Sequence, residues 1–330
     1  MKKKSKLIVF TFLSIAIATT SCQKKDTKNE SGMPAFKEMT YDEREATRPE
    51  PTQTQLAYMN SLPMYDKAAF DKAIDKIENN NTKKSLPIVM AIGGQQRIFK
   101  WNGSSWDEPN PAAHLWQVEA SKNSGSGSVW GTSTNFHIFR WNGASWDEPN
   151  PNASLRLVVP MSNSVAYGIG TNLRIYVTIN GGVSWSLFSA LTSVTWMSVG
   201  GSSSQIYAIS GATVSNLFKY SPTSGTFTTL NLGFRSDRVS TSSNGGAVYT
   251  TRIDPKSGGG YNYTMYKNIN NSGYVVTPFP NEVEISSSGD NSNLWTIGTG
   301  NNIYTSPVNG DWWIEPNTAA RAIMITAGYY

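Results

Sequence analysis

The stretch SVWGTSTNFHIFRWNGASW, residues 128–146, decides the fold of this 330-residue chain. It contains short runs of apolar residues that are separated by turns rich in Ser, Thr, Asn and Gly. Asn-Gly between two such runs is a strong signal for a β-hairpin. A near copy of its second half, IFKWNGSSWDEPNP at 98–111, is followed 40 residues later by IFRWNGASWDEPNP at 138–151. The stretch is therefore one unit of a repeat.

The repeat continues through most of the chain. Segments built from an apolar, a large or aromatic, and a small residue recur six times, and their central residues are separated by 40, 37, 40, 42 and 46 positions. The central residues are Met90, Trp130, Tyr167, Tyr207, Tyr249 and Trp295. A period near 40 residues with three or four short strands per unit is typical of the blades of a β-propeller. We expect the central residues to pack between blades.

The length of the repeat region fits six blades. Residues 87–330 number 244, and six units of about 40 residues require about 240. Blades two to six each begin with an inner strand, such as LRLVVPM at 155–161, whereas blade one has none. The unmatched segment RAIMITAG at 321–328 fits the missing strand. The sequence therefore predicts an all-β domain over residues 82–330, a six-bladed β-propeller whose C-terminal strand closes blade one and protects the sheet edges.

Two segments precede the predicted propeller. Residues 22–50 are highly charged and contain few aliphatic residues, which is the composition of a flexible, solvated tether. Within residues 51–81, apolar residues recur at the spacing of one helix face, namely Phe70, Ala73, Ile74 and Ile77. We expect one or two short helices there that pack against the propeller or act as a spacer. Recruitment of a partner is the alternative.

The first residues have the composition of an export signal. MKKKSK is followed by an apolar run of about a dozen residues, too short to span a membrane about 30 Å thick, and then by TTSC. The small residues before Cys22 resemble a lipobox, with Thr19 where Leu is usual. We expect residues 1–21 to be a lipoprotein signal peptide, Cys22 to carry a membrane-anchoring lipid, and Gln23 to favour the outer membrane. A buried N-terminal helix is the alternative.

Removal of such a leader changes the charge of the protein. The full chain has 28 Lys and Arg and 23 Asp and Glu, and four of the lysines lie in the leader. The remaining 24 basic and 23 acidic residues give the mature chain a net charge near +1. Binding to a polyanion requires a basic patch that displaces several counterions, so nucleic acid is not an expected partner. Because Cys22 is the single cysteine, the fold cannot depend on an intrachain disulfide.

The Val-Trp-Gly strand, the Ile-Phe-Arg-Trp-Asn-Gly hairpin and the closing Ser-Trp of residues 128–146 resemble the tectonin family of β-propellers, which includes tachylectin-like and fish-egg lectins. The resemblance covers residues 87–330 and is weaker in blades four and five. It implies a six-bladed propeller that binds bacterial surface glycans. A second resemblance, of IYVTINGGVSW at 175–185 to the Asp-box hairpin of sialidase-type propellers, has Asn180 where Asp is usual. Asp-boxes are structural turns, so this resemblance supports the fold rather than catalysis.

Few side chains are suited to catalysis or metal binding. His114 and His137 are the two histidines beside a single cysteine, so neither a Cys/His metal cluster nor a Cys/His dyad can be built. No GxSxG, P-loop or dinucleotide motif stands between a strand and a helix. The arginines of the propeller occupy different repeat positions, unlike the cluster that a sialidase-like enzyme requires. We expect no cofactor, no metal and no catalysis; a glycan-processing enzyme of sialidase-like fold is the alternative.

The tripeptide Glu-Pro-Asn recurs after the closing aromatic residue of blades one, two and six. Propeller closure makes these blades neighbours, and the three loops share a face with the loop from Thr132 to His137. Carboxylate and carboxamide groups hydrogen-bond sugar hydroxyls, and proline limits the entropy lost on binding. The candidate ligand-binding residues are Glu108, Asn110, Glu148, Asn150, Glu315 and Asn317. The alternative is that Glu-Pro-Asn only shapes a turn.

Tryptophans at the hairpin ends are further candidates. Trp101, Trp141 and Trp312 can stack on a sugar ring, or they can pack in the core. The sequence favours a monomeric, lipid-anchored, lectin-like propeller at the outer membrane that binds a glycan or a cell-surface protein and does not catalyse a reaction. A structural or protein-interaction surface lipoprotein is a third reading.

Overall fold

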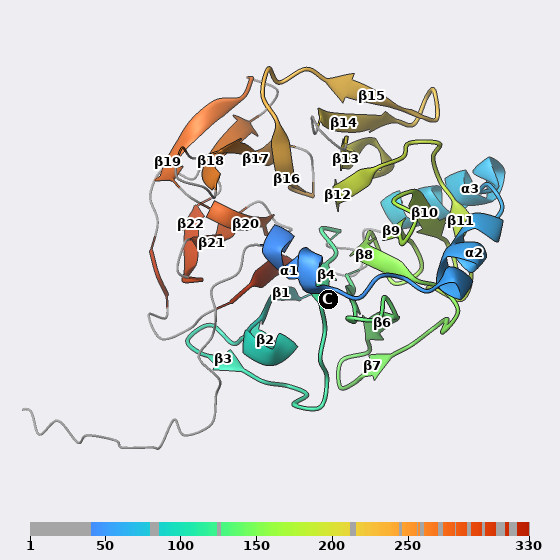
Figure 1. The fold of residues 1–330 in the computed structure, drawn as a ribbon, viewed down its shortest axis with the longest axis horizontal. Helices are drawn as coiled ribbons and strands as arrows, with labels where there is room; N and C mark the ends of the chain where they lie inside the picture. The colour runs from blue at the N-terminus through green and yellow to red at the C-terminus, as the bar shows by residue number, and fades with distance from the viewer. Residues whose placement is uncertain are drawn as a thin grey trace, which may run out of the picture. The chain divides into compact units, whose positions relative to one another are not determined.

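Six antiparallel sheets surround a common axis in the computed structural model (Figure 1), so the fold is the predicted all-β, six-bladed propeller. The structure describes residues 41–79, 86–123, 127–211, 216–243, 246–255, 257, 261–269, 273–280, 282–288, 292–298, 301–307, 314–316 and 322–329. They all belong to one compact unit, Glu38–Tyr330.

The first three blades each contain four strands. From the axis outward, blade one consists of β23 (Met324–Tyr329), β1 (Pro87–Ile92), β2 (Ile98–Trp101) and β3 (Trp106–Asp107). Blade two consists of β4 (Gln117–Ala120), β5 (Val129–Thr132), β6 (Ile138–Trp141) and β7 (Trp146–Asp147). Blade three consists of β8 (Leu155–Pro160), β9 (Ala166–Gly170), β10 (Ile175–Thr178) and β11 (Ser186–Leu187).

The other three blades follow the same plan. Blade four consists of β12 (Val194–Val199), β13 (Ile206–Ser210), β14 (Asn216–Ser221) and β15 (Thr226–Leu230). Blade five consists of β16 (Ser236–Thr241), β17 (Ala247–Pro255), β18 (Tyr261–Ile269) and β19 (Val275–Pro280). Blade six consists of β20 (Glu282–Ser287), β21 (Asn293–Gly298) and β22 (Ile303–Pro307), with Ile314 bridged to Thr305 at its outer edge.

Closure of the ring occurs in blade one, as the sequence predicts. The C-terminal strand β23 pairs antiparallel with β1 along its whole length, from Pro87 opposite Tyr329 to Ile92 opposite Met324. The six central residues of the repeat occupy equivalent second-strand positions and are all buried. Large side chains at this one position fill the space between adjacent sheets.

Three helices precede the propeller: α1 (Tyr41–Thr47), α2 (Gln53–Ser61) and α3 (Lys67–Glu78). α2 begins with a capping box, in which the side chains of Thr52 and Gln55 each accept a hydrogen bond from the other residue's backbone amide. α3 begins after Asp66, whose carboxylate accepts the amide of Ala69. The predicted apolar face of α3 is buried through Phe70, Ile74 and Ile77.

Residues 41–50 differ from the flexible tether predicted for residues 22–50. They contain α1, and Arg44 and Arg48 are buried against the propeller. A highly charged segment is usually solvated. A guanidinium can nevertheless be buried where carbonyl oxygens and aromatic rings replace the water molecules around it. Residues 22–40, with Cys22, lie outside the described residues.

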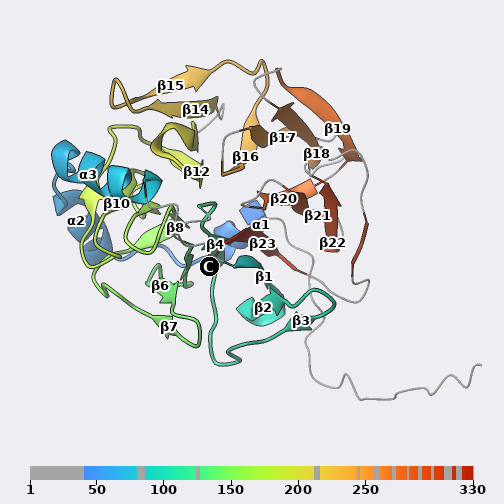
Figure 2. The same ribbon diagram turned by 180° about the vertical axis from the view of Figure 1, so that it is seen from behind.

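Residues 41–79, which we call the N-terminal clamp, wrap around blade three. α1 lies near the axis on the face toward the viewer in Figure 1, which we call the front face, and α3 lies on the back face seen in Figure 2. Between the two faces, Met64 forms a parallel bridge to Leu187 of β11. The Tyr65 amide donates to the Leu187 carbonyl at 2.9 Å, and the Leu187 amide donates to the Pro63 carbonyl at 2.7 Å. The clamp thus covers the outer edge of a very short strand.

A repeated hydrogen bond ties the inner strands together. The inner-strand residues opposite the six central residues are, in blades one to six, Thr326, Glu119, Val159, Ser198, Ser240 and Ser286. Four of these residues, the threonine and the three serines, carry a hydroxyl group. Each hydroxyl accepts a hydrogen bond of 2.9 to 3.1 Å from a backbone amide in the inner strand of the next blade. The pairs are Thr326 with Ala120, Ser198 with Thr241, Ser240 with Ser287, and Ser286 with Ala327. The pattern stops at Glu119 because the next blade has Pro160, which lacks an amide hydrogen, and at Val159, which has no acceptor.

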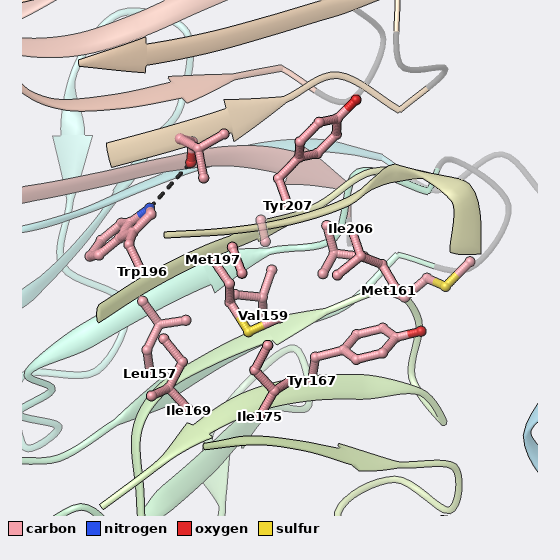
Figure 3. Packing of buried hydrophobic residues seen from close by; sticks show 14 of the residues in the cluster. Leu157, Val159, Met161, Tyr167, Ile169, Ile175, Trp196, Met197, Ile206 and Tyr207 are labelled. Carbon is pink, nitrogen blue, oxygen red and sulfur yellow. Dashed lines mark hydrogen bonds between the residues drawn. The ribbon is translucent and has the colours of Figure 1, made fainter. Parts of the chain in front are cut away.

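Where the hydroxyl pattern stops, other contacts join the blades. Apolar side chains of blades three and four pack against each other, among them Val159 and Met197 (Figure 3). In blade two, Lys122 is buried and its ammonium donates to the Ser286 hydroxyl at 3.0 Å and to the carbonyls of Ser287 and Ala327. Lys122 therefore links blade two to blades six and one.

Candidate functional site: a cleft between the N-terminal clamp and blade two

The glutamates of the Glu-Pro-Asn loops pair with residues of their own blades. Glu108 accepts two hydrogen bonds from the guanidinium of Arg97, one of them from Nε at 2.6 Å, and this pairing raises the pKa of Arg97. In blade two, Glu148 forms the equivalent contact with the imidazole Nδ1 of His137. Both pairs join a loop to the start of the third strand, so they support the loop geometry.

The asparagines of the same loops shape turns. The side-chain oxygen of Asn110 accepts the amide of Ala112 at 3.2 Å. That of Asn150 accepts the amide of Asn152 at 3.0 Å, and Asn150 is buried. Glu315 of blade six is half-buried next to the bridge formed by Ile314. Asn317 lies outside the described residues, so the third loop is only partly defined.

The candidate tryptophans pack against other rings. Trp101 is half-buried and contacts Trp106 and Trp295, with ring centroids 5.3 and 6.1 Å apart. Trp141 is buried and contacts Trp146 at 5.3 Å. Ring contacts of this kind agree with core packing, which is the alternative to stacking on a sugar ring. Trp312 lies outside the described residues.

A cleft of about 520 Å³ lies beside the blade-two loop, between the N-terminal clamp and the propeller. Its clamp side is lined by Pro49, Glu50, Thr52, Thr54, Gln55 and Tyr58. Its propeller side is lined by Asn135, Phe136, His137, Pro151, Asn152 and Ser154. The sequence predicts that the loop from Thr132 to His137 lies beside the Glu-Pro-Asn loops. The clamp wall, however, comes from residues about 80 positions away, and no local sequence pattern marks it.

Hydrogen bonds hold the two walls of the cleft together. The Gln55 side-chain amide donates to the Asn135 carbonyl at 2.9 Å, and the Asn150 side-chain amide donates to the Tyr58 hydroxyl at 3.4 Å. Met59, one residue further along α2, is buried between blades two and three, and its carbonyl accepts the Tyr176 hydroxyl at 2.6 Å. The clamp wall is therefore fixed to the propeller at several points.

The cleft offers hydrogen-bonding groups and aromatic edges rather than a strong charge. Exposed carboxamides of Asn135 and Asn152 both donate and accept hydrogen bonds, and His137, Tyr58 and Glu50 add an imidazole, a phenol and a carboxylate. A volume in this range holds a small molecule. The arrangement suits a polar, neutral ligand with several hydroxyl groups.

Neither a metal site nor a membrane span accompanies the cleft in the described part of the chain. No group of three or more His, Cys, Asp or Glu side chains within the described ranges is placed to hold a metal ion. None of the helices that the structure describes has the length and apolarity to span a membrane.

The fold and the cleft define the chain as a six-bladed β-propeller with an N-terminal clamp. The sequence matches no protein-family model and no curated protein. Among solved structures, TolB from Acinetobacter baumannii is similar with a TM-score of 0.53 and 10% identity, over 83% of this chain and 72% of that one. A putative TolB from Agrobacterium tumefaciens has a TM-score of 0.50 and 12% identity, over 72% of this chain and 89% of that one.

A Niastella koreensis GH74 enzyme is also similar, with a TM-score of 0.46 and 15% identity over 72% of this chain. This chain covers 46% of that enzyme's length. At these identities the likeness to the two TolB structures shows the propeller fold alone, because propellers of unrelated function share one architecture.

Proposed function

We propose that this protein is a lectin-like binding protein that takes a glycan into the cleft between the N-terminal clamp and blade two. The cleft carries the proposal, because it places two exposed carboxamides, an imidazole and a phenol around a space of about 520 Å³, which is in the range of small-molecule sites. The resemblance of residues 128–146 to tectonin propellers supports the same ligand class. The protein acts by binding and not by catalysis.

The Glu-Pro-Asn loops have a supporting role in this proposal. Glu148 and Asn150 lie behind the cleft, where they hold His137 and Tyr58 in place. Glu108 and Asn110 support the equivalent loop of blade one, whose residues do not line this cleft. The ligand contacts are therefore assigned to the cleft residues, and the loop residues position them.

A glycan array probed with the mature chain carrying Cys22→Ser tests the proposal directly. Asn135→Ala and Asn152→Ala should each weaken binding of the best glycan by about 5- to 30-fold in calorimetry, because each removes a hydrogen bond of about 1–2 kcal/mol. Thr229→Ala on the exposed outer strand of blade four is the matched control and should bind normally. If no glycan binds, or if the cleft variants bind like the control, the assignment is wrong. Cleavage of a bound glycan would instead favour an enzyme.

The proposed location is the outer membrane, with the lipid on Cys22 as the anchor. The support is the sequence of the leader, with Cys22 at its end, and Gln23 directly after the cysteine. Cys22→Ala should release the protein from the membrane fraction or leave an unprocessed precursor, because acylation supplies most of the binding energy for a membrane. A processed Cys22→Ala protein that stays in the membrane fraction would contradict the anchor.

A further inference from the structure

The side chain of Arg48 fills a polar pocket on the front face, formed by backbone carbonyls of blades two and three. Its Nε donates to the Thr134 carbonyl at 3.1 Å, and its Nη1 donates to the Arg156 carbonyl at 3.0 Å. Its Nη2 donates to the Ser133 carbonyl at 2.6 Å and to the Thr132 hydroxyl at 3.4 Å. Every guanidinium nitrogen therefore has an oxygen partner in the propeller, and the side chain is completely buried.

Aromatic rings form the walls of the same pocket. The guanidinium carbon of Arg48 lies 4.1 Å from the ring centre of Phe136 and 5.3 Å from that of Trp116. Glu45 closes the pocket, since its carboxylate lies 3.4 Å from Arg48 and also accepts the indole N–H of Trp116. Two aromatic rings beside several hydrogen-bond acceptors suit a planar guanidinium, which has five N–H donors and can pack against a ring. They suit a compact ammonium group less well.

The ring of Phe136 reaches the pocket from a turn that recurs in the propeller. Phe136 has φ +68°, and the equivalent residues Gln96, Leu173 and Asn301 also have φ near +60°. The carbonyl of each accepts an amide at the start of the next inner strand, as Phe136 does from Leu155 at 2.9 Å. The left-handed turn thus belongs to the blade junction, and among these four described turns only that of blade two carries an aromatic side chain.

Short chain connections link this pocket to the cleft. Pro49 and Glu50, which follow Arg48 directly, line the clamp side of the cleft, and α2 begins at Gln53. A chain extends by at most about 3.6 Å per residue, so the position of Arg48 restricts where the first turn of α2 can lie. Phe136 takes part in both sites, because it lines the cleft as well.

We propose that this pocket is a guanidinium receptor and that Arg48 acts in it as a latch. Occupancy of the pocket by Arg48 holds the beginning of the N-terminal clamp against the propeller and so builds the clamp wall of the cleft. An arginine or another guanidinium compound that competes for the pocket releases this wall. The ligand of the cleft rests on the proposed function, but the latch is a property of the unliganded protein.

Chemical rescue of Arg48→Ala tests the latch in the mature chain carrying Cys22→Ser. Amide hydrogen exchange in residues 41–61 should become at least tenfold faster, while exchange in β9 and β10 stays unchanged. Methylguanidinium at tens of millimolar should restore slow exchange, and methylammonium at equal ionic strength should not. Arg97→Ala, which removes an arginine from a peripheral ion pair, is the matched control and should show neither effect.

The results separate the possible explanations. Unchanged exchange in Arg48→Ala, or equal rescue by methylammonium, overturns the latch. Arg48→Lys keeps the positive charge but not the planar guanidinium, so its hydrogen exchange should be as fast as that of Arg48→Ala. Exchange at the wild-type rate in Arg48→Lys would also overturn the proposal of a guanidinium receptor. This variant supplies the test if Arg48→Ala does not fold. If exchange responds as expected but no glycan binds to any form, the latch stands and the glycan proposal fails.

Discussion

Blades one and two contain nearly the same sequence in two different environments. Residues 98–111 and 138–151 differ at two of 14 positions, Lys100 against Arg140 and Ser104 against Ala144. Their hairpins are alike: the side-chain oxygen of the turn asparagine accepts an amide at 2.8 Å in both, and the two tryptophans of each hairpin lie 5.3 Å apart. Local sequence therefore decides the turn and the pairing of the rings.

The two copies differ in what covers them. Asn150 is buried and donates to the Val183 carbonyl at 3.0 Å and to Tyr58, whereas Asn110 is half-buried. Trp141 is buried in the main core, whereas Trp101 is half-buried. At Asn150 the extra contacts come from the N-terminal clamp, through Tyr58, and from the hairpin of blade three, through Val183. The burial of a repeat position thus depends on the segments that surround it. The same residue type at equivalent positions of two blades can therefore contribute differently to the free energy of unfolding.

Removal of β23 should break blade one and give the largest effect. Deleting residues 321–330 takes away the inner strand that pairs with β1 and the Thr326 hydroxyl that accepts the Ala120 amide. Because a row of backbone groups would lose its partners, we expect aggregation or loss of cooperative thermal unfolding. Deleting only Tyr330 is the control and should leave the transition sharp. A deletion variant that melts as sharply as the intact protein contradicts the closure.

Truncation of the equivalent tryptophans should reveal the difference between the two blades. Trp141→Ala should lower the free energy of unfolding by about 3–5 kcal/mol, because it empties a buried site. Trp101→Ala should cost less, about 1–3 kcal/mol, because water can reach part of the space. Urea denaturation of both variants measures the two values. Equal costs would show that the difference in burial between the two tryptophans does not affect stability.

Much of the fold could be predicted because the repeat carries it. The column of central residues and the segment at 321–328 were enough to count the blades and to close the ring, since each unit repeats the same pattern of burial and turns. The structural effect of a single residue that differs from the repeat pattern was harder to predict. That Pro160 leaves Glu119 without an amide to accept is visible only when the inner strands are aligned in space.

The candidate site was harder to predict than the fold. The Glu-Pro-Asn motif drew attention to Glu148 and Asn150, which lie at the cleft, but their side chains are engaged in pairing and turn formation. The clamp wall escaped prediction because residues 41–50 look like a solvated segment, and burial of Arg48 depends on carbonyls that come together only in the folded propeller. Long-range contacts of this kind leave no periodic signal in a single sequence.

At the axis, blade two should give the protein an unusual pH dependence. Burial raises the pKa of Glu119 to about 7 despite the positive charge of Lys122, and burial lowers the pKa of Lys122 to about 8 despite the negative charge of Glu119. Between pH of about 4.5 and 7 the folded state holds more protons at Glu119 than the unfolded state, so stability falls as pH rises. Above about 8 the unfolded state holds more protons at Lys122, so stability rises again.

Unfolding by urea at constant ionic strength from pH 4.5 to 10 measures this dependence. A minimum in the free energy of unfolding is expected between about pH 7 and 8. The double variant Glu119→Gln/Lys122→Met should show a flatter profile, because both titrating groups are gone. The single variant Lys122→Met should lose about 1–3 kcal/mol near neutral pH, since it leaves the carbonyls of Ser287 and Ala327 without their donor. A double variant with the wild-type profile would assign the dependence to other groups.

The smallest expected effect separates the two asparagines of the Glu-Pro-Asn loops. Asn150→Ala removes the turn acceptor and the two hydrogen bonds to Val183 and Tyr58 at a buried site, so it should lower the free energy of unfolding by about 1–2 kcal/mol. Asn110→Ala removes a turn contact at a half-buried site and should cost about 0.5 kcal/mol. Thermal unfolding of both variants and of the double variant measures these values. The costs should add, because the sites belong to different blades and share no hydrogen-bond partner. If Asn110→Ala costs as much as Asn150→Ala, the turn itself accounts for the stability and the clamp contributes nothing measurable to this loop.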